Sequence, residues 1–183
     1  MITFQKIKWK NFLSTGDHFS EIDFTKNGTN LIVGTNGTGK STVLDALTFS
    51  LFNKPFRKIN KSQLINATNE KDCLVEVEFN INGKEYLVRR SIKPNLFEIE
   101  VNGQKMHKQA DDRAMQKILE ENILKVNYKS FTQIVILGSS AFVPFMQLSG
   151  TNRREVIEDL LDIRIFSAMN VIISCLLYTS DAA

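Results

Sequence analysis

The chain has 183 residues, of which 43% are hydrophobic and 23% are charged, and its net charge is +3. This length allows one domain with a real core, or one domain with a short appendage. The composition is that of an ordinary globular protein, and the charge is too small to indicate a nucleic-acid-binding protein by itself. Any basic surface must therefore be argued locally.

The two cysteines and the apolar segments limit the compartment. Cys73 and Cys175 stand far apart without metal-ligand spacing, which favours free thiols in a reducing compartment over a disulfide framework or a zinc site. The N-terminus has no apolar signal segment. Residues 171–178, the most apolar late stretch, are too few to span a bilayer. We therefore expect a soluble, cytoplasmic protein with no membrane partner.

The first quarter of the chain predicts two strands, a buried strand and a helix. Residues 2–12 alternate between apolar side chains and lysines, and residues 19–24 alternate more weakly. Residues 29–34 (TNLIVG) form a short apolar run ending in glycine, which is typical of a buried strand that leads into a loop. Residues 41–52 are apolar on all sides and predict a buried helix, which Pro55 prevents from continuing.

The middle of the chain predicts an antiparallel meander. Residues 74–82 place apolar side chains on one face and polar ones on the other, and Asn82-Gly83 then supplies a tight hairpin turn. Residues 85–92 return, and residues 97–101 alternate again before a second turn dipeptide, Asn102-Gly103. We expect a meander with one solvated face, lying as a second layer beside a P-loop core sheet.

The last third is predicted to be mainly helical. Residues 111–125 have helical periodicity, and residues 131–137 form a short apolar run that we interpret as a buried strand. A final helix is expected over residues 152–174, capped by Thr151. Residues 175–183 (CLLYTSDAA) continue no pattern and resemble translated cloning or adapter sequence, so we expect a non-native tail.

One motif predicts nucleotide chemistry. Residues 34–41 (GTNGTGKS) match GxxxxGK[ST] and lie between a predicted strand and a predicted helix, the context that the motif requires. Its glycines let the backbone curl so that several N–H groups point at one anion, and the helix adds its positive end. Lys40 would reach the β- and γ-phosphates, and the Ser41 hydroxyl would complete a Mg²⁺ shell. The alternative is a glycine-rich turn that binds nothing, but a chance match is on the order of one in a hundred.

Hydrolysis needs more than a phosphate loop. An acidic residue at the end of an apolar strand must hold Mg²⁺, and a further group must orient water. The 183 residues contain no run of apolar residues followed by Asp-Glu. Residues 147–150 (QLSG) resemble the start of the LSGG signature of ABC-type ATPases, but no acidic strand follows, and we interpret them as a helix-capping turn. We therefore expect binding of ATP and Mg²⁺ but no hydrolysis by this chain alone.

With these motifs, the chain resembles the SMC-like branch of ABC ATPases that acts in DNA double-strand-break repair. "KWKNFLSTGD" resembles the first strand of that family, and "NLIVGTNGTGKSTVLDALTFSLFNKPF" resembles its P-loop and first helix. "SFTQIVILGSSAFVPFMQLSGTNRREVIEDLLDI" resembles its Q-loop and the helix that leads into a coiled coil. The resemblance implies an α/β P-loop NTPase head. Residues 1–150 would form its N-terminal half, with the P-loop at 34–42, and residues 151–174 would begin the coiled coil.

The resemblance also implies a function, partners and site residues. In that family two heads sandwich two ATP molecules, and a nuclease subunit binds near the coiled coils. The implied function is ATP-driven head dimerisation and DNA-end processing, in the cytoplasm of a bacterium or of a phage-infected host. The implied partners are the C-terminal half of the head, a second copy, a nuclease subunit and double-stranded DNA. Gln133 matches the Q-loop glutamine, which with Lys40 would be catalytic and with Ser41 would contact Mg²⁺. The positions matched to nucleotide binding are Asn36, Gly37, Thr38, Gly39, Lys40, Ser41, Thr42, Asn66, Ala67 and Thr68.

Two further points stay open. Cellular relatives carry a basic residue at the position of Leu13, so either nucleotide affinity is weaker here or another residue supplies that contact. Lys54, Arg57, Lys58 and Lys61 lie within eight residues without an acidic neighbour, and form either a solvated loop or a contact with the DNA backbone.

Two alternative functions are the nucleotide-binding domain of a transporter and an ATP-dependent DNA tether that does not hydrolyse ATP. The long, charged helix after the Q-loop favours a coiled coil over the transporter.

Overall fold

The computed structural model describes residues 2–26, 28–106, 111–137, 143–161 and 163–180. They fall into two compact units, Met1–Leu124 and Lys125–Ala183, and each is described here by itself. Within the described part of the chain, no helix is both long enough and apolar enough to cross a bilayer.

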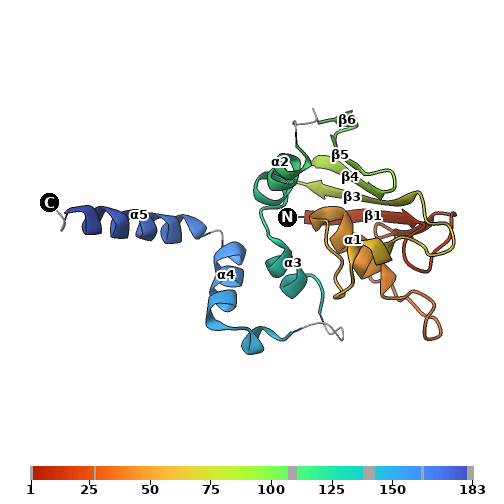
Figure 1. Cartoon of the computed structure of the whole chain (residues 1–183), viewed down its shortest axis with the longest axis horizontal. Coiled ribbons are helices and arrows are strands. Elements are labelled where there is room, and N and C mark those ends of the chain that lie inside the picture. Colours follow the sequence, from red (N-terminus) through yellow and green to blue (C-terminus); the bar gives the residue numbers. More distant parts are fainter. Residues whose placement is uncertain (1, 27, 107–110, 138–142, 162, 181–183) are drawn as a thin grey trace. The chain divides into compact units, whose positions relative to one another are not determined.

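The first unit is built on one six-stranded sheet, in which every neighbouring pair of strands is antiparallel (Figure 1). The predicted meander is confirmed. Asn82 and Asn102 adopt φ of 51° and 50°, and the glycines that follow them have φ of 82° and 77°, as tight hairpins require. The strand order is β2-β1-β3-β4-β5-β6, with bounds β1 Ile2–Lys10, β2 Ser20–Asp23, β3 Cys73–Ile81, β4 Lys84–Ile92, β5 Leu96–Val101 and β6 Gln104–Lys105.

The sheet has one covered face and one solvated face. In β3, Val75, Val77 and Phe79 are fully buried, whereas Glu76 and Glu78 point to the other face. The covered face packs against α1, Thr42–Phe52, through β1, β3 and β4 (Figure 1). Ten of the eleven residues of α1 are buried, so the helix predicted from its all-round apolar character is confirmed.

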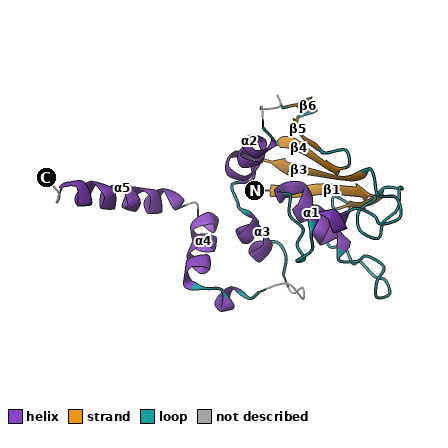
Figure 2. Cartoon of the chain, in the orientation of Figure 1, coloured by secondary structure: helices purple, strands orange, loops and turns teal. Residues whose placement is uncertain are grey.

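The predicted buried strand over residues 29–34 is wrong. Leu31 is 87% exposed and Val33 is 80% exposed, and Figure 2 draws this stretch as loop. A strand is stable only when a neighbouring strand takes up its backbone N–H and C=O groups. Among the described residues no strand pairs with this segment, so the expected P-loop core sheet does not form there.

Short helical segments complete the first unit. A 3₁₀ turn, η1, covers Lys61–Leu64. The helix predicted over residues 111–125 is confirmed as α2, Asp112–Lys117, which continues as the π-helical η2, Ile118–Leu124.

The second unit is helical, with α3 at Tyr128–Ile134, η3 at Phe145–Gln147, α4 at Gly150–Leu160 and α5 at Arg164–Ser180. The strand predicted over residues 131–137 is therefore wrong. A short apolar run does not distinguish a strand from a buried helix, and here a cap decides. The Asn127 side chain accepts a hydrogen bond from the Ser130 N–H at 2.9 Å and starts α3.

The single helix expected over residues 152–174 is two helices. The cap is Ser149, whose Oγ accepts from the Asn152 N–H at 3.4 Å, and not Thr151. The interpretation of residues 147–150 as a capping turn agrees with this contact. The N–H of Ile163 donates to the Glu158 carbonyl at 3.0 Å. This is the 6→1 hydrogen bond of a Schellman motif, which ends a helix. Of the expected tail, α5 includes residues up to Ser180 and residues 181–183 lie outside the described part, as do residues 138–142 of the Q-loop resemblance.

Candidate nucleotide-binding site

The phosphate loop curls tightly between residue 34 and the start of α1. Gly37 and Gly39 both adopt φ of +90°, a conformation that residues with a Cβ rarely take. A Cβ on Gly39 would lie 3.3 Å from the Thr42 Oγ1, and a Cβ on Gly34 would lie 2.6 Å from the Thr38 Oγ1. The glycines of the motif are therefore required by the geometry of this loop.

Hydrogen bonds within the loop fix its polar groups. The Lys40 Nζ donates to the carbonyl oxygens of Gly34 at 2.8 Å and Thr35 at 2.7 Å. The Thr38 hydroxyl donates to the same Thr35 carbonyl at 2.8 Å. The ammonium group thus lies against the loop whose N–H groups are predicted to bind phosphate, where its charge would add to theirs.

A pocket of about 520 Å³ opens beside the loop. It combines the loop with apolar side chains from two other segments, Leu13 after β1 and Ile65 and Ala67 after η1. Such a mixture offers donors to a phosphate group and apolar surface to a base. None of the lining residues is acidic. They are Leu13, Ser14, Asn36, Gly37, Gly39, Lys40, Ser41, Thr42, Arg57, Gln63, Ile65 and Ala67.

Asn66, predicted to lie near the base or ribose, is fully used in holding two loops together. Its Nδ2 donates to the carbonyls of Leu13 at 3.2 Å and Thr15 at 3.0 Å. Its Oδ1 accepts from the N–H groups of Thr68 at 2.9 Å and Asn69 at 3.0 Å. The side chain therefore positions the Leu13 wall of the pocket, and a direct contact with a nucleotide would have to replace these bonds.

An ion pair beside the pocket was not predicted. Asp45, in the first turn of α1, is completely buried, and its Oδ1 accepts from the Arg57 N–H at 2.9 Å. Its Oδ2 accepts from the Arg57 Nε at 2.7 Å and lies 2.6 Å from Nη2. The sequence signal was the only charged residue in a mostly apolar helix. Arg57, expected as a DNA contact, is thus a structural residue that also lines the pocket beside the phosphate loop.

The other three predicted DNA contacts lie outside that pocket. Lys54 and Lys58 are exposed. The Lys61 Nζ lies 5.8 Å from the centroid of the Phe49 ring. Burial, with a contribution from nearby Arg90, lowers the pKa of Lys61. The structure therefore separates this basic segment into one residue at the nucleotide pocket and three elsewhere.

Gln133 belongs to the second unit. It lies near the end of α3, and its Oε1 is buried without a hydrogen-bond partner among the described residues. A buried amide oxygen without a partner is costly and unusual in a native structure. Its contact with Mg²⁺ and water stays a prediction. Within the described residues, no three His, Cys, Asp or Glu side chains gather as metal ligands.

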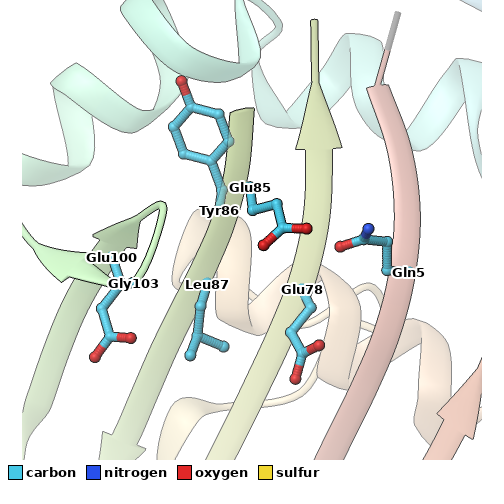
Figure 3. A pocket seen from close by; sticks show the side chains of 7 residues that line it. All are labelled: Gln5, Glu78, Glu85, Tyr86, Leu87, Glu100 and Gly103. Atoms are coloured by element: carbon cyan, nitrogen blue, oxygen red, sulfur yellow. The ribbon is translucent and has the colours of Figure 1, made fainter. Parts of the chain in front are cut away.

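A smaller depression on the solvated face of the sheet has the opposite charge. Glu78, Glu85 and Glu100 line it from three neighbouring strands, together with Gln5 and Leu87 (Figure 3). Its volume is about 190 Å³. Three carboxylates would repel a polyphosphate, so this depression is not a nucleotide site.

The curled glycine loop, the lysine against it and the buried helix behind it define a P-loop nucleotide-binding domain. The chain belongs to the AAA domain family, whose model matches residues 6–167.

Known relatives point in the same direction. Over 165 residues the chain is 44% identical to exonuclease subunit 2 of Enterobacteria phage T4, covering 90% of this chain and 29% of that protein. Over 165 residues it is 28% identical to the DNA double-strand break repair Rad50 ATPase of Thermoplasma volcanium, covering 87% of this chain and 18% of that one. The chain therefore spans less than a third of either relative.

A solved structure agrees. It is described as "Structural biochemistry of ATP-driven dimerization and DNA stimulated activation of SMC ATPases", and it matches with a TM-score of 0.60 and 26% identity. The match covers 86% of this chain and 99% of that chain. The resemblance to SMC-like ATPases of DNA repair and the α/β fold class are confirmed.

Proposed function

We propose that this chain is the ATP-binding N-terminal part of an ATPase that processes DNA ends together with a nuclease subunit. The observation that carries the proposal is the phosphate loop, whose two positive-φ glycines and Lys40 border a pocket of about 520 Å³. The names of the relatives support the biological setting, since they include a phage exonuclease subunit, a DNA double-strand break repair ATPase and a component of the nuclease SbcCD.

The residues present fit Mg-ATP. Backbone N–H groups of residues 36–42 and the Lys40 ammonium would hold the phosphates, and Lys40 would exchange its present carbonyl partners for them. Ser41 precedes α1 but makes no capping hydrogen bond with its side chain, so its hydroxyl can serve as a metal ligand. Bound Mg²⁺ would supply neutralisation of charge on the β- and γ-phosphates. Leu13, Ile65 and Ala67 would pack against the base.

Hydrolysis and assembly require residues from outside this pocket. Because no acidic side chain lines it, the carboxylate that completes the Mg²⁺ shell would come from the C-terminal half of the head. A second head would close the site over ATP, in the cytoplasm, with double-stranded DNA and a nuclease subunit as further partners. Gln133 would orient the attacking water, and α4 and α5 would lead toward the coiled coil.

Nucleotide affinity tests the proposal. The change in fluorescence of a labelled ATP analogue on binding would be measured with Mg²⁺ for the chain, for Lys40→Ala and for the exposed-lysine control Lys58→Ala. We expect Lys40→Ala to weaken binding at least tenfold and Lys58→Ala to leave it unchanged. Circular dichroism would check that both variants fold. Equal affinity of Lys40→Ala and the parent chain would overturn the proposal.

Turnover distinguishes the remaining alternative, a tether that binds ATP without hydrolysing it. ATP hydrolysis would be measured for the full-length dimer with and without DNA. Turnover that increases with DNA supports the processing ATPase, whereas binding without turnover would support the tether.

A further inference from the structure

A second cationic pocket lies at the opposite end of α1 from the phosphate loop. Asn53, which caps the C-terminus of α1, forms part of its wall. Three cationic side chains, Lys61, Arg90 and Arg113, line this pocket with a single carboxylate, Asp112. Its volume is about 250 Å³, and its charged residues leave a net positive charge.

Arg90 is the buried cation of the pocket. It is only 5% exposed, and its Nε donates to the Ser50 carbonyl at 2.9 Å. Nη2 donates to the Gln116 Oε1 at 2.5 Å, and Cζ lies 3.8 Å from the centroid of the Phe97 ring. All of these partners are neutral. Among the described residues, no carboxylate oxygen lies within 4.0 Å of the guanidinium group.

A buried cation without a close counter-ion is costly. Burial lowers the pKa of Arg90 to about 9, although the charges of Asp112 and Glu120 act in the opposite direction. The group is therefore still cationic at neutral pH. An anion that entered the pocket would provide the missing counter-charge.

The other two cations add to the positive charge that a bound anion would neutralise. Lys61 and Arg90 line the same pocket, and partial burial together with the charge of Arg90 lowers the pKa of Lys61, although Asp112 acts in the opposite direction. Arg113 is exposed, and its guanidinium makes no ion pair with any described residue. Repulsion among these groups would be relieved by a bound anion.

The size of the pocket favours a single phosphate group with its attached sugar. Asn53 and Lys61, the two ends of the segment formed by residues 53–61, line the pocket. A pocket of about 250 Å³ is smaller than the roughly 300–1,000 Å³ of typical small-molecule sites. A phosphodiester group with its sugar fits this size, and such groups repeat along the backbone of a nucleic acid.

We propose that Lys61, Arg90 and Arg113 bind a backbone phosphate of double-stranded DNA, without reading its sequence. The proposal rests on the DNA-processing function proposed above and locates one contact of that function. The phosphate would bind to Lys61 and Arg113 at the mouth of the pocket, over the guanidinium of Arg90.

The test uses Lys61→Gln/Arg113→Gln, which leaves the hydrogen bonds of Arg90 in place. Binding of a fluorescent 30-base-pair duplex would be followed by anisotropy at several KCl concentrations. We expect at least tenfold weaker binding and a salt dependence of log K that is flatter by about 0.9 per lost phosphate contact. The charge-matched control Lys26→Gln/Lys84→Gln and the charge-retaining Lys61→Arg/Arg113→Lys should bind as the parent chain does. Melting temperatures would verify the fold of each variant.

The outcomes separate this pocket from the general function. If the parent chain binds DNA and Lys61→Gln/Arg113→Gln binds equally well with the same salt slope, the pocket assignment is wrong, while ATP binding is unaffected. If the parent chain binds ATP but no DNA, both this proposal and the DNA part of the function fail. Inorganic phosphate at constant ionic strength gives a further arm. Stabilisation of the parent chain by phosphate, with equal DNA affinity of both proteins, would assign the pocket to free phosphate and overturn the DNA contact.

Discussion

Arg57 holds the buried Asp45 carboxylate with both its backbone N–H and its guanidinium group, at 2.9, 2.7 and 2.6 Å. Asp45 belongs to the first turn of α1 and Arg57 to the loop that follows the helix. The contact therefore ties that loop to the start of the helix, next to the phosphate loop.

Arg57→Ala should destabilise the domain by about 2–3 kcal/mol, because it removes both guanidinium contacts and leaves the buried carboxylate with only the backbone N–H of residue 57. Urea unfolding would measure the loss. Lys58→Ala, at the neighbouring exposed position, should change the free energy of unfolding by less than about 0.5 kcal/mol. Similar values for the two variants would show that the Arg57 contact contributes little. Charge reversal at Arg57 is consequently a poor test of DNA binding, since it disturbs the fold.

Adjacent arginines on opposite faces of β4 should respond differently to lysine. Arg90→Lys should cost about 2–3 kcal/mol, because one ammonium cannot reach the Ser50 carbonyl and Gln116 together or stack on Phe97. Arg89 instead pairs with carboxylates on the solvated face, where a lysine keeps the charge. Arg89→Lys should cost less than about 1 kcal/mol. Urea unfolding of both variants checks the prediction, and the reverse order would contradict it.

Cys73 should give the stability a pH dependence. Burial raises the pKa of its thiol from 9.0 to about 12. Between these values the unfolded chain releases the proton while the folded chain retains it, so the free energy of unfolding should fall as pH rises from about 9 to 12. Comparison with Cys73→Ala over pH 8–11 isolates this contribution. Parallel pH profiles for the two proteins would exclude it.

Cysteine labelling provides an independent measurement. At pH 8 iodoacetamide should modify exposed Cys175 quickly and Cys73 only on unfolding. Mass spectrometry of peptides would distinguish the two sites. Rapid labelling of Cys73 in the folded protein would show that its surroundings open readily.

The 183-residue chain should not hydrolyse ATP above background. Its nucleotide pocket is lined by the phosphate loop and by Arg57 but by no acidic side chain. Charge that develops in phosphoryl transfer would then be only partly compensated. A coupled phosphate-release assay would measure turnover. Activity that disappears in Lys40→Ala would reveal a catalytic carboxylate within this chain that the pocket does not show.

The sequence predicted those features whose causes are local. The meander follows from alternation and from Asn-Gly turns, which carry their own backbone preference, and the phosphate loop follows from its glycines. The strand over residues 29–34 could not be judged in this way, because an apolar run forms a strand only if a partner strand is present. The run over residues 131–137 was ambiguous for another reason, since strand and buried helix share that pattern and the cap at Asn127 decided.

In the candidate sites, too, features with local causes were predictable and contacts between distant residues were not. Glycine spacing located the phosphate loop, but Arg57 lies 12 residues from Asp45 in the chain, and Ser50 lies 40 residues from Arg90. No periodicity connects such positions. A charged residue within an apolar stretch does signal that a partner exists, and only the fold identifies it.

The pairing of β1 with β3 has a consequence for the order of folding. The meander closes through turns of two or three residues, whereas pairing Lys10 with Leu74 encloses the phosphate loop and α1 in a single long connection. Closing roughly 60 residues costs about 3 kcal/mol more conformational entropy than closing two. The meander should therefore form early, and β1 should join it late. Mutations in the meander would slow folding, mutations in β1 would mainly accelerate unfolding, and a bound nucleotide would stabilise the part of the domain that assembles last.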